Sequence, residues 1–557
     1  MQQKGRLLVI LLFILALFFG IALRLVQLAT MQRGFLRKQG DARILRRVKI
    51  EANRGIIVDR HNQPLAISTA VASYYFNPKL FKPTAKQIKA LAKALSVSPS
   101  YIRKRIRRGK GRGFFYLKRR LPMSTQVAVK ALHIPGLSIM QESRRYYPQG
   151  EIASHVLGFT NIDDRGQEGL ELAYDQWLTG VAGEKLVVHD RLGREVETVS
   201  IKKKPKPGRT LQLALDAKIQ YIAHEALEKA VQKFDARSGS LVVLDARNGD
   251  ILAMVNQPTY DPNHKNGVPV ENFRNRAVTD VFEPGSTMKP FTVAQALISK
   301  KFTTRSKIDT HRGHMRIGGY TIRDDLNFGT VTLEQLLQKS SNIAAAKIML
   351  SLDARKYWKL LQAIGLGQRT ESGFPGEAEG VVNGRDRWYP SELATMAYGY
   401  GISVSALQLA HAYSILAAHG VSHPVSFVKR TEEPMATRVL PRDVADTVVH
   451  MLESVVKKGG TGTRAAIPGY RVAGKTGTAY IASGKGYDKK RYASSFVGMA
   501  PASNPRLVVA VVIHEPKHRH FGAVVAAPTF KTVMERSLHL LQVDPDNLPV
   551  PRGRHAH

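Results

Sequence analysis

The longest apolar run of the chain lies near its N-terminus. Residues Leu7 to Leu23 contain no charged or hydrogen-bonding side chain, and the apolar run resumes after Arg24. About 20 such residues cross the ~30 Å hydrocarbon core of a bilayer as a helix, with the Arg24 side chain extending to the headgroups. A cleaved signal peptide is the alternative, but its apolar core would be unusually long and no clean small-x-small cleavage site follows it before Arg24. We therefore expect an uncleaved anchor over residues 7–28, after a short tail of residues 1–6.

Beyond the anchor, the apolar pattern changes at a break rich in Pro and Lys, residues 201–208. Before the break, short strands, helices and turns alternate. After it, Asp216 is a typical helix N-cap, and apolar residues recur at helical spacing over residues 219–230. We predict a first domain over residues 31–204, a second domain over residues 209–545 and a disordered tail over residues 546–557.

The second domain carries both strand and helix signals. Residues 241–244 and 251–255 flank a turn with Asn248-Gly249, which predicts a hairpin because Asn-Gly accepts the positive φ angles of a type I′ turn. The apolar run 507–513 has the length of a buried strand, and apolar positions between Phe530 and Leu541 recur on one side of a final helix. Helix, paired strands, a long helical middle and late strands indicate an α+β domain, with helices on an antiparallel sheet.

Composition narrows the class of protein. The 557 residues are 43% hydrophobic, which excludes wholesale disorder, and Cys is absent, which excludes a Cys nucleophile, zinc–thiolate sites and disulfides. Lys and Arg number 83 against 44 Asp and Glu, a net charge of +39. Nucleic acid, an anionic membrane surface and a polyanionic substrate such as a cell-wall polymer are the candidate partners.

The basic residues are densest between Arg103 and Arg120. The chain has no zinc-finger ligands, no RNA-binding aromatic strand and no basic-leucine heptads, so nothing supports nucleic-acid binding. A solvated basic face is the simplest interpretation, and the role of this stretch stays open.

Candidate chemistry begins at residues 283–290, Glu-Pro-Gly-Ser-Thr-Met-Lys-Pro. Pro290 fits only the first turn of a helix, so we expect a helix to begin near Ser286, whose hydroxyl would lie at the positive end of the helix dipole. Lys289 lies one turn further on the same face, where its amine can reach the Ser286 hydroxyl. A desolvated lysine near other cations has a lowered pKa and can act as a base.

A Ser-x-x-Lys pattern alone is weak, because Ser200 to Lys203 and Ser454 to Lys457 match it by chance. Ser286 differs because two further motifs come after it in the chain: Ser340-Ser341-Asn342 at a probable helix start, then Lys475-Thr476-Gly477 in a probable strand. Each piece alone has a structural explanation, as a cap or an edge-strand charge. In this order they match an acyl-transfer constellation of a nucleophilic Ser, a Lys base, a second Ser with Asn and a Lys-Thr-Gly strand.

Residues 469–476 also fit the phosphate-binding pattern G-x-x-x-x-G-K-[ST]. Such a loop must follow a buried strand and open a helix at its Lys. Here residues 465–468 make a poor buried strand, and the glycines and threonines after Lys475 favour strand and turn. We therefore do not expect an ATP site.

With these motifs in place, the chain resembles the class B penicillin-binding proteins, and most closely their septal, cell-division transpeptidases. The resemblance covers nearly the whole chain. It includes the anchor and the following motifs: Arg54-Gly55 with Asp59-Arg60, Arg145-Tyr146-Tyr147-Pro148, Gly166-Gln167-Glu168-Gly169, the Ser286 motif, Ser340-Ser341-Asn342, Tyr398-Gly399-Tyr400-Gly401, Gly459-Gly460-Thr461-Gly462 and Ala473 to Ala479. It implies the penicillin-binding, serine-transpeptidase fold with an all-helical subdomain, an elongated non-catalytic α+β pedestal and one transmembrane helix.

The resemblance also implies a mechanism. Ser286 would attack the carbonyl between the two terminal D-Ala residues of a donor stem peptide, and an amine of a second stem peptide would resolve the acyl-enzyme. Lys289 would be the base, with Ser340 and Lys475 completing a proton relay. Asn342 would bind the donor amide, while Thr476, Gly477 and Thr478 would hold its carboxylate end. The backbone N–H groups of Ser286 and Thr478 would form the oxyanion hole. No metal or organic cofactor is implied.

The resemblance further implies covalent inhibition by β-lactams and a place in the bacterial inner membrane, with a cytoplasmic N-terminus and a periplasmic catalytic domain. The implied partners are a lipid-II-polymerising glycosyltransferase and other divisome proteins, and no nucleic acid. Three alternatives remain: the elongation-specific class B transpeptidase, a non-catalytic divisome scaffold, and a membrane-tethered nucleic-acid or ATP binder.

Overall fold

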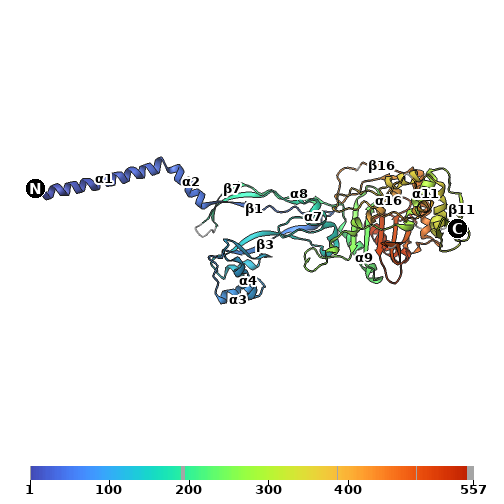
Figure 1. Cartoon of the computed structure of the whole chain (residues 1–557), viewed down its shortest axis with the longest axis horizontal. Helices are drawn as coiled ribbons and strands as arrows, with labels where there is room; N and C mark the ends of the chain where they lie inside the picture. Colours follow the sequence, from blue (N-terminus) through green and yellow to red (C-terminus); the bar gives the residue numbers. More distant parts are fainter. Residues whose placement is uncertain (1, 190–194, 386, 434, 485, 548–557) are drawn as a thin grey trace, which may run out of the picture. The chain divides into compact units, whose positions relative to one another are not determined.

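The computed structural model describes residues 2–189, 195–385, 387–433, 435–484 and 486–547. The chain forms two compact units (Figure 1). The first unit comprises Met1–Arg54 and Thr179–Gly208, and the second comprises Gly55–Leu178 and Arg209–His557.

The first unit contains the predicted anchor. Residues 7–28 lie within helix α1 (Gln2–Thr30), which is the one helix among the described residues that is long and apolar enough to cross a membrane. Helix α2 (Arg33–Ile44) follows it. A three-stranded antiparallel sheet completes the unit, in the order β1 (Leu45–Ile50), β6 (Gly183–His189), β7 (Glu195–Lys203).

The second unit begins with a five-stranded sheet on which three short helices pack. The sheet has the order β4-β3-β2-β8, and β5 pairs with the long strand β3. Its strands are β2 (Ile57–Val58), β3 (Pro64–Phe76), β4 (Phe115–Pro122), β5 (Leu137–Tyr146) and β8 (Leu211–Gln212). Helices α3 (Ala85–Ala94), α4 (Pro99–Gly109) and α5 (Thr125–Lys130) pack on it through an apolar core that includes Ile88, Leu91 and Ile102. We call residues 71–141 the head lobe.

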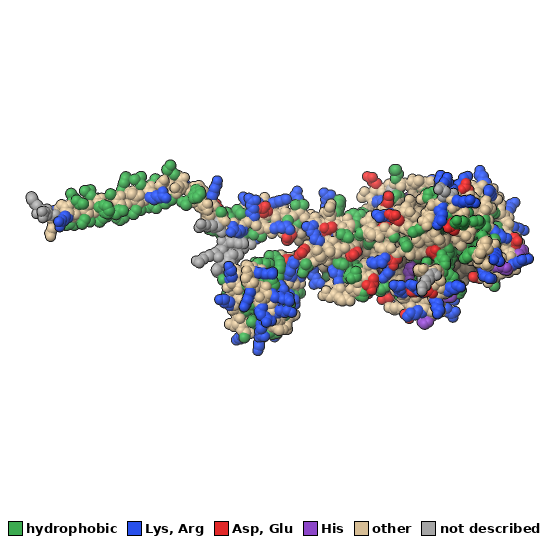
Figure 2. Space-filling view, in the orientation of Figure 1, with side chains coloured by type: hydrophobic (Ala, Val, Ile, Leu, Met, Phe, Trp, Pro, Cys, Tyr) green, Lys and Arg blue, Asp and Glu red, His purple; other side chains and the backbone are tan. Residues whose placement is uncertain are grey.

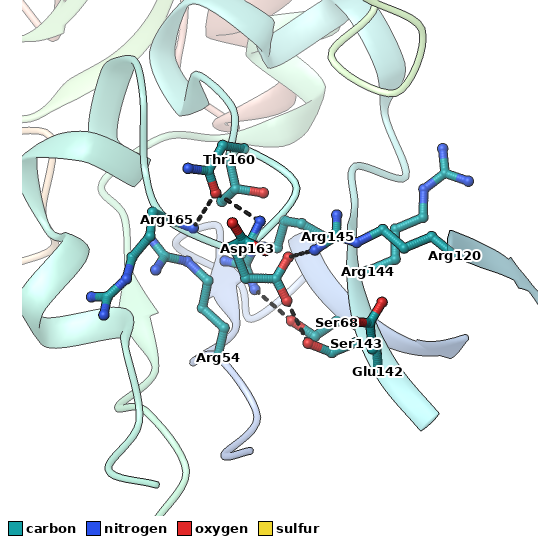
Figure 3. Close-up of polar contacts among 12 residues, drawn as sticks. Arg54, Ser68, Arg120, Glu142, Ser143, Arg144, Arg145, Thr160, Asp163 and Arg165 are labelled. Atoms are coloured by element: carbon teal, nitrogen blue, oxygen red, sulfur yellow. Dashed lines mark hydrogen bonds and ion pairs between the residues drawn. The ribbon is translucent and has the colours of Figure 1, made fainter. Parts of the chain in front are cut away.

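A buried ion pair ties the base of this sheet together. The Arg145 side chain on β5 lies 2.6 Å from Glu171 on α7 (Gly169–Ala173), and both side chains are at most 1% exposed. The same guanidinium donates to the carbonyl oxygen of Gly55 at 2.8 Å (Figure 3 shows the surroundings of Arg145). One cation therefore holds a strand, a helix and a turn that are distant in the sequence. Short helices α6 (Ser154–Leu157) and α8 (Asp175–Leu178) and the 3-10 turn η1 (Gly150–Ala153) complete this region.

The part of the second unit that follows residue 208 is built on a five-stranded antiparallel sheet, in the order β10-β9-β19-β18-β17. Its strands are β9 (Ser238–Asp245), β10 (Ile251–Gln257), β17 (Ala473–Ser483), β18 (Gly486–Ala500) and β19 (Leu507–His514). Because successive strand residues point to opposite faces, Leu241 and Val243 pack on helices α9 (Ala217–Lys233) and α19 (Ala527–Leu540). Val242 and Leu244 face the helical lobe on the other side. The buried apolar run predicted at 507–513 is thus the central strand, β19.

The helical lobe covers the second face of the sheet. It contains α10 (Arg276–Thr279), α11 (Lys289–Ile298), α12 (Leu333–Lys339), α13 (Asn342–Ser351), α14 (Ala354–Ala363), α15 (Pro390–Met396), α16 (Ala406–Ala417) and α17 (Arg442–Val456). Three small hairpin-like pairs accompany it: β11 (Lys307–Asp309) with β14 (Thr330–Thr332), β12 (His314–Ile317) with β13 (Tyr320–Arg323), and β15 (Val421–Ser422) with β16 (Thr437–Arg438). Short pieces η2 (Val270–Phe273), η3 (Gly285–Met288), η4 (Thr463–Ala465) and α18 (Gly522–Val525) lie between these elements.

Several local predictions are confirmed. Asp216 caps α9 by accepting from the backbone N–H groups of Lys218 and Ile219, and the final helix is α19. The hairpin around Asn248-Gly249 forms as β9 and β10, but the predicted type I′ turn is wrong. Gly249 has a positive φ of 77° and Asn248 does not, because the connection is longer than two residues and its register shifts at Ile251.

Contacts within the chain group residues 55–178 with residues 209–557. The predicted domain bounds, 31–204 and 209–545, stay a prediction. The predicted tail began at residue 546, yet Asp546 accepts from the Arg471 backbone N–H at 2.7 Å, and the Asn547 N–H donates to Gly469. Residues 548–557 lie outside the described part of the chain.

The buried pair generates a stability prediction. Glu171→Gln keeps the shape of the side chain but leaves the Arg145 charge buried without its counter-charge, which typically costs about 3–5 kcal/mol. We expect the midpoint of thermal unfolding to fall by several degrees, measured by scanning calorimetry on the full chain. Glu225→Gln removes the shared partner of exposed Lys229 and Arg536 and is the control, with an expected change below about 1 kcal/mol. Equal effects of the two substitutions would contradict the assignment.

Candidate active site

Ser286 lies where a 3-10 turn runs into a helix. The turn η3 leads directly into α11, and Pro290 occupies the first turn of that helix, as predicted. Lys289 follows Ser286 by one turn, and its Nζ lies 2.9 Å from the Ser286 Oγ. The local sequence therefore places the amine beside the hydroxyl without help from distant residues.

The second pair of predicted residues approaches from the junction of α12 and α13. Ser340 has a left-handed backbone (φ 62°), which ends α12 and turns its side chain and carbonyl toward the same amine. The Lys289 Nζ donates to the Ser340 Oγ at 3.1 Å, to the Ser340 carbonyl oxygen, and to the Asn342 Oδ1 at 2.8 Å. A left-handed conformation is uncommon for a residue other than glycine, and such strain concentrates at functional sites.

Asp324 fixes this junction, and nothing in the sequence pattern identified it. Its carboxylate accepts from the Ser341 hydroxyl at 2.6 Å and from the Ile343 N–H at 3.1 Å, at the start of α13. The Asn342 amide donates to the Arg323 carbonyl oxygen at 2.9 Å, which leaves its Oδ1 to accept from Lys289. Asp324 thus holds the loop that presents Ser340 and Asn342.

Lys475 contacts the Ser340 hydroxyl as well, from the strand of the sheet. It lies on β17, the edge strand of the sheet, as predicted, and its Nζ is 2.9 Å from the Ser340 Oγ. The side chains of Ser286, Lys289, Ser340 and Lys475 therefore form one continuous chain of hydrogen bonds. These four predicted residues lie in one hydrogen-bonded cluster, and Asn342 joins it through Lys289.

Burial governs the charges of the two amines. Lys289 and Lys475 are both fully buried. Burial lowers the pKa of Lys289 to about 7, although the carboxylates of Asp324 and Asp325 oppose this change. Burial, and then the charge of Lys289, lowers the pKa of Lys475 well below its usual value. With a pKa of about 7, Lys289 is partly unprotonated at neutral pH, and that form can accept a proton.

The rest of the Lys-Thr-Gly strand shapes the cleft. The Thr476 Oγ1 lies 3.0 Å from the Thr461 Oγ1, and the Thr478 Oγ1 accepts from the Gly522 N–H at 3.1 Å. At Gly477 a Cβ would lie 2.3 Å from the Ser495 Oγ and 2.9 Å from the Pro284 carbonyl oxygen, so only glycine lets β17 pack against the Ser286 loop. Among these, Thr461 and Gly522 were not assigned a role from the sequence.

The competing motifs lie elsewhere or in the wrong structure. Ser200 is on strand β7, and Ser454 is near the C-terminal end of α17, so neither pairs with its Lys as Ser286 does. Lys475 is inside a strand, whereas a phosphate-binding loop requires it at the start of a helix. Within the described ranges, no group of three or more His, Cys, Asp or Glu side chains is arranged to hold a metal ion.

Comparisons with known proteins agree with this geometry. Residues 239–535 match the penicillin-binding protein transpeptidase domain, and residues 49–213 match the penicillin-binding protein dimerisation domain. The probable peptidoglycan D,D-transpeptidase PenA of Neisseria meningitidis is 40% identical over 550 residues, covering 98% of this chain and 94% of the relative. The peptidoglycan D,D-transpeptidase FtsI of Escherichia coli is 38% identical over 531 residues, covering 94% and 90%.

Solved structures are similar as well. The transpeptidase domain of penicillin-binding protein 3 from Burkholderia pseudomallei is 46% identical, with a TM-score of 0.56 over 60% of this chain and 98% of that one. Penicillin-binding protein 3 from Mycobacterium tuberculosis, solved with ampicillin, is 27% identical, with a TM-score of 0.71 over 90% and 98%. These matches agree with the arrangement of the Ser286 hydroxyl and the buried amines of Lys289 and Lys475. The chain belongs to the penicillin-binding protein transpeptidase family, and its dimerisation domain precedes the transpeptidase domain.

Proposed function

We propose that this protein is a peptidoglycan D,D-transpeptidase that cross-links stem peptides through an acyl-enzyme on Ser286. The observation that carries the proposal is the hydrogen-bonded chain from Ser286 through Lys289 and Ser340 to Lys475. The names of the Neisseria and Escherichia relatives, both peptidoglycan D,D-transpeptidases, support the substrate class.

In the first half-reaction, the unprotonated Lys289 amine takes the Ser286 proton while the oxygen attacks the carbonyl between the two terminal D-Ala residues. The backbone N–H groups of Ser286 and Thr478 stabilise the oxyanion, a contribution of typically ~3–4 kcal/mol per donor. The C–N bond then breaks. The leaving D-Ala amine receives the proton held by Lys289 through the Ser340 hydroxyl, which Lys475 orients by its hydrogen bond. An ester on Ser286 remains.

In the second half-reaction, an acceptor amine attacks this ester, gives up a proton to the relay and restores the Ser286 hydroxyl. The Asn342 side chain binds the donor amide, and Lys475 with the Thr476 and Thr478 hydroxyls binds the terminal carboxylate. Gly477 allows the strand to approach the bound peptide. The reaction exchanges one amide for another, so no redox partner or external energy source is required.

The same attack explains inhibition by β-lactams. Their amide is strained and its leaving group stays tethered, so the acceptor amine cannot enter after Ser286 opens the ring. The chain has no Glu-x-x-Leu-Asn motif of the class A β-lactamases, whose Glu activates a hydrolytic water. We therefore propose that the acyl-enzyme is long-lived.

We further propose a septal role, in the inner membrane. Helix α1 would be the single membrane span, with a cytoplasmic N-terminus, a periplasmic catalytic domain and a lipid-II-polymerising glycosyltransferase as divisome partner. The elongation-specific transpeptidase is the alternative, since it shares the motifs. Depletion separates them, because loss of septal cross-linking gives filaments and loss of elongation gives spheres. A scaffold without activity would give no acylation at all.

The nucleophile assignment is tested by covalent labelling. Ser286→Ala removes the attacking oxygen, so we expect no adduct with a fluorescent penicillin on a denaturing gel, and no modified peptide containing residue 286 by mass spectrometry. Ser200→Ala is the matched control, because it disrupts a chance Ser-x-x-Lys pattern and should label as the unaltered protein does. Labelling that survives Ser286→Ala would overturn the assignment.

The pH dependence of acylation tests the role of Lys289. Only the neutral amine can act as base, and its pKa is about 7. The second-order rate of penicillin acylation should therefore rise about tenfold per pH unit below about pH 7 and level off above it. Lys289→Arg, which stays protonated, should lower the rate by at least about a hundredfold and remove this inflection. A rate that falls as the pH rises through 7 would exclude Lys289 as the base.

The Tyr398–Gly401 turn supports the nucleophile loop through backbone contact. The Gly285 N–H donates to the Gly399 carbonyl oxygen, and at Gly399 (φ 85°) a Cβ would lie 2.1 Å from the Gly285 carbonyl oxygen. We expect Gly399→Ala to displace Ser286 and slow acylation about a hundredfold, measured by stopped-flow labelling. Gly401→Ala has a similar φ of 74° with open space around it, so its rate should change by less than about threefold.

A further inference from the structure

The head lobe belongs to a part of the chain that has no negative charge. Between Asp59 and Glu142 the sequence contains no Asp and no Glu, while it contains 17 Lys and Arg residues. A solvated surface that keeps a protein soluble mixes both signs of charge. An excess of one sign over more than 80 consecutive residues therefore favours a partner of the opposite sign.

The fold places seven of these 17 cations on the exposed side of two helices and three more beside the helix ends. Helix α3 packs on the sheet through Ile88, Leu91 and Ala92, and this leaves its lysines on the outer face. Helix α4 does the same through Ile102. The exposed cations of this surface, which we call the basic face, are Lys82, Lys86, Lys89, Lys93, Arg103, Lys104, Arg107, Arg108, Lys110 and Arg112. Figure 2 shows Lys and Arg side chains gathered on the lobe that carries α3 and α4 in Figure 1.

The cations closest to the base of the lobe already have partners. Arg119 pairs with Glu142 at 2.9 Å and with Asp163 at 3.2 Å, and Arg120 pairs with Asp164 at 2.9 Å. Figure 3 shows Arg120, Glu142 and Asp163 in this cluster. By contrast, no member of the basic face makes an ion pair with any described residue. Glu142, Asp163 and Asp164 therefore neutralise the cations near the base of the lobe, whereas the cations of α3 and α4 have no acidic partner among the described residues.

We propose that the basic face binds the anionic headgroups of the membrane in which α1 is anchored. Because the chain is anchored, a bilayer surface is always within reach. Weak contacts between single cations and headgroups then add up, since no acidic side chain of the basic face opposes them. The headgroup of an anionic lipid such as phosphatidylglycerol, which has a phosphodiester and no cation, stays negative at all physiological pH values. Stem peptides are a poorer match, because the amines that transpeptidation consumes neutralise part of their carboxylate charge.

The chain's lack of Cys gives a direct test on the full-length protein. Ala85→Cys places one thiol on the exposed start of α3, where a donor dye can be attached. The protein is reconstituted in nanodiscs that carry an acceptor dye on their headgroups. We expect energy transfer to rise at least about twofold when about 30% phosphatidylglycerol replaces phosphatidylcholine, and this rise to disappear between about 0.05 and 0.5 M salt.

A charge-reversed variant distinguishes the basic face from the overall charge. The variant carries Lys86→Glu, Lys89→Glu, Arg103→Glu and Arg107→Glu, and should lose most of the phosphatidylglycerol-dependent rise. The control reverses four exposed cations of the catalytic domain, Arg305, Lys307, Lys356 and Lys359, and should keep the rise. Penicillin labelling of both variants at the rate of the parent protein shows that the catalytic domain remains folded.

Two outcomes would overturn the proposal. Energy transfer that does not depend on phosphatidylglycerol, or that both variants lose equally, would remove the basic face as a membrane contact. Salt-sensitive binding to isolated cell wall, lost in the variant while energy transfer stays flat, would assign the face to the wall polymer instead. Neither outcome bears on Ser286, because the labelling assay reports the proposed function separately.

Discussion

Two lysine amines buried in one cleft are the constraint on which the catalytic domain depends. Holding the pKa of Lys289 at about 7 rather than its usual 10.5 corresponds to about 5 kcal/mol of lost ammonium solvation at neutral pH. That is comparable with the whole stability of many domains, ~5–15 kcal/mol. The cost is tolerable because the two cores on either side of the sheet are large, and because each Nζ keeps hydrogen bonds to Ser340.

The neighbouring backbone explains how such a cleft can persist. Ser340 keeps a left-handed φ because Asp324 captures the hydroxyl and N–H groups of the next residues, so its strain is offset by charge-assisted hydrogen bonds. Gly477 lets the edge strand contact the Ser286 loop at a distance that any side chain would prevent. Three separate segments therefore meet here: β17 packs on the Ser286 loop at Gly477, and the Ser340 junction is joined to that loop by the hydrogen bonds of Lys289.

Sequence reasoning succeeded where the physical signal is local. The capped helix after Asp216 and the apolar run of β19 need only nearest neighbours and periodicity, and the three motifs carry recognisable chemistry in a fixed order. It gives no information on contacts that join distant segments. Residues 55–178 pack with the catalytic domain because β2 pairs in parallel with β8 and because Asn263 exchanges hydrogen bonds with the Tyr147 backbone. No spacing in a single sequence reveals such pairs.

The same reason explains why Asp324 was missed. A single aspartate after a short hairpin gives no periodic signal in the sequence. Its role depends on α13, whose first residues lie beside it only in the folded chain. The type I′ turn failed for a different reason. Asn-Gly permits that turn, but the contact of Gly249 with the segment at Pro424, where a Cβ would lie 2.5 Å from a carbonyl oxygen, selects a longer connection. Tertiary packing chose among turns that the local sequence allowed equally.

Lysine serves two opposite purposes in this chain, and solvation decides which. In the cleft, removing water makes the ammonium form unfavourable, so Lys289 becomes a base at neutral pH. On α3 and α4 the same side chain stays hydrated and charged, and its lack of counter-charges leaves a field that acts over about a Debye length, ~8–10 Å. A net charge of +39 thus says little by itself. Its meaning depends on which amines the fold buries and which it leaves in water without an acid nearby.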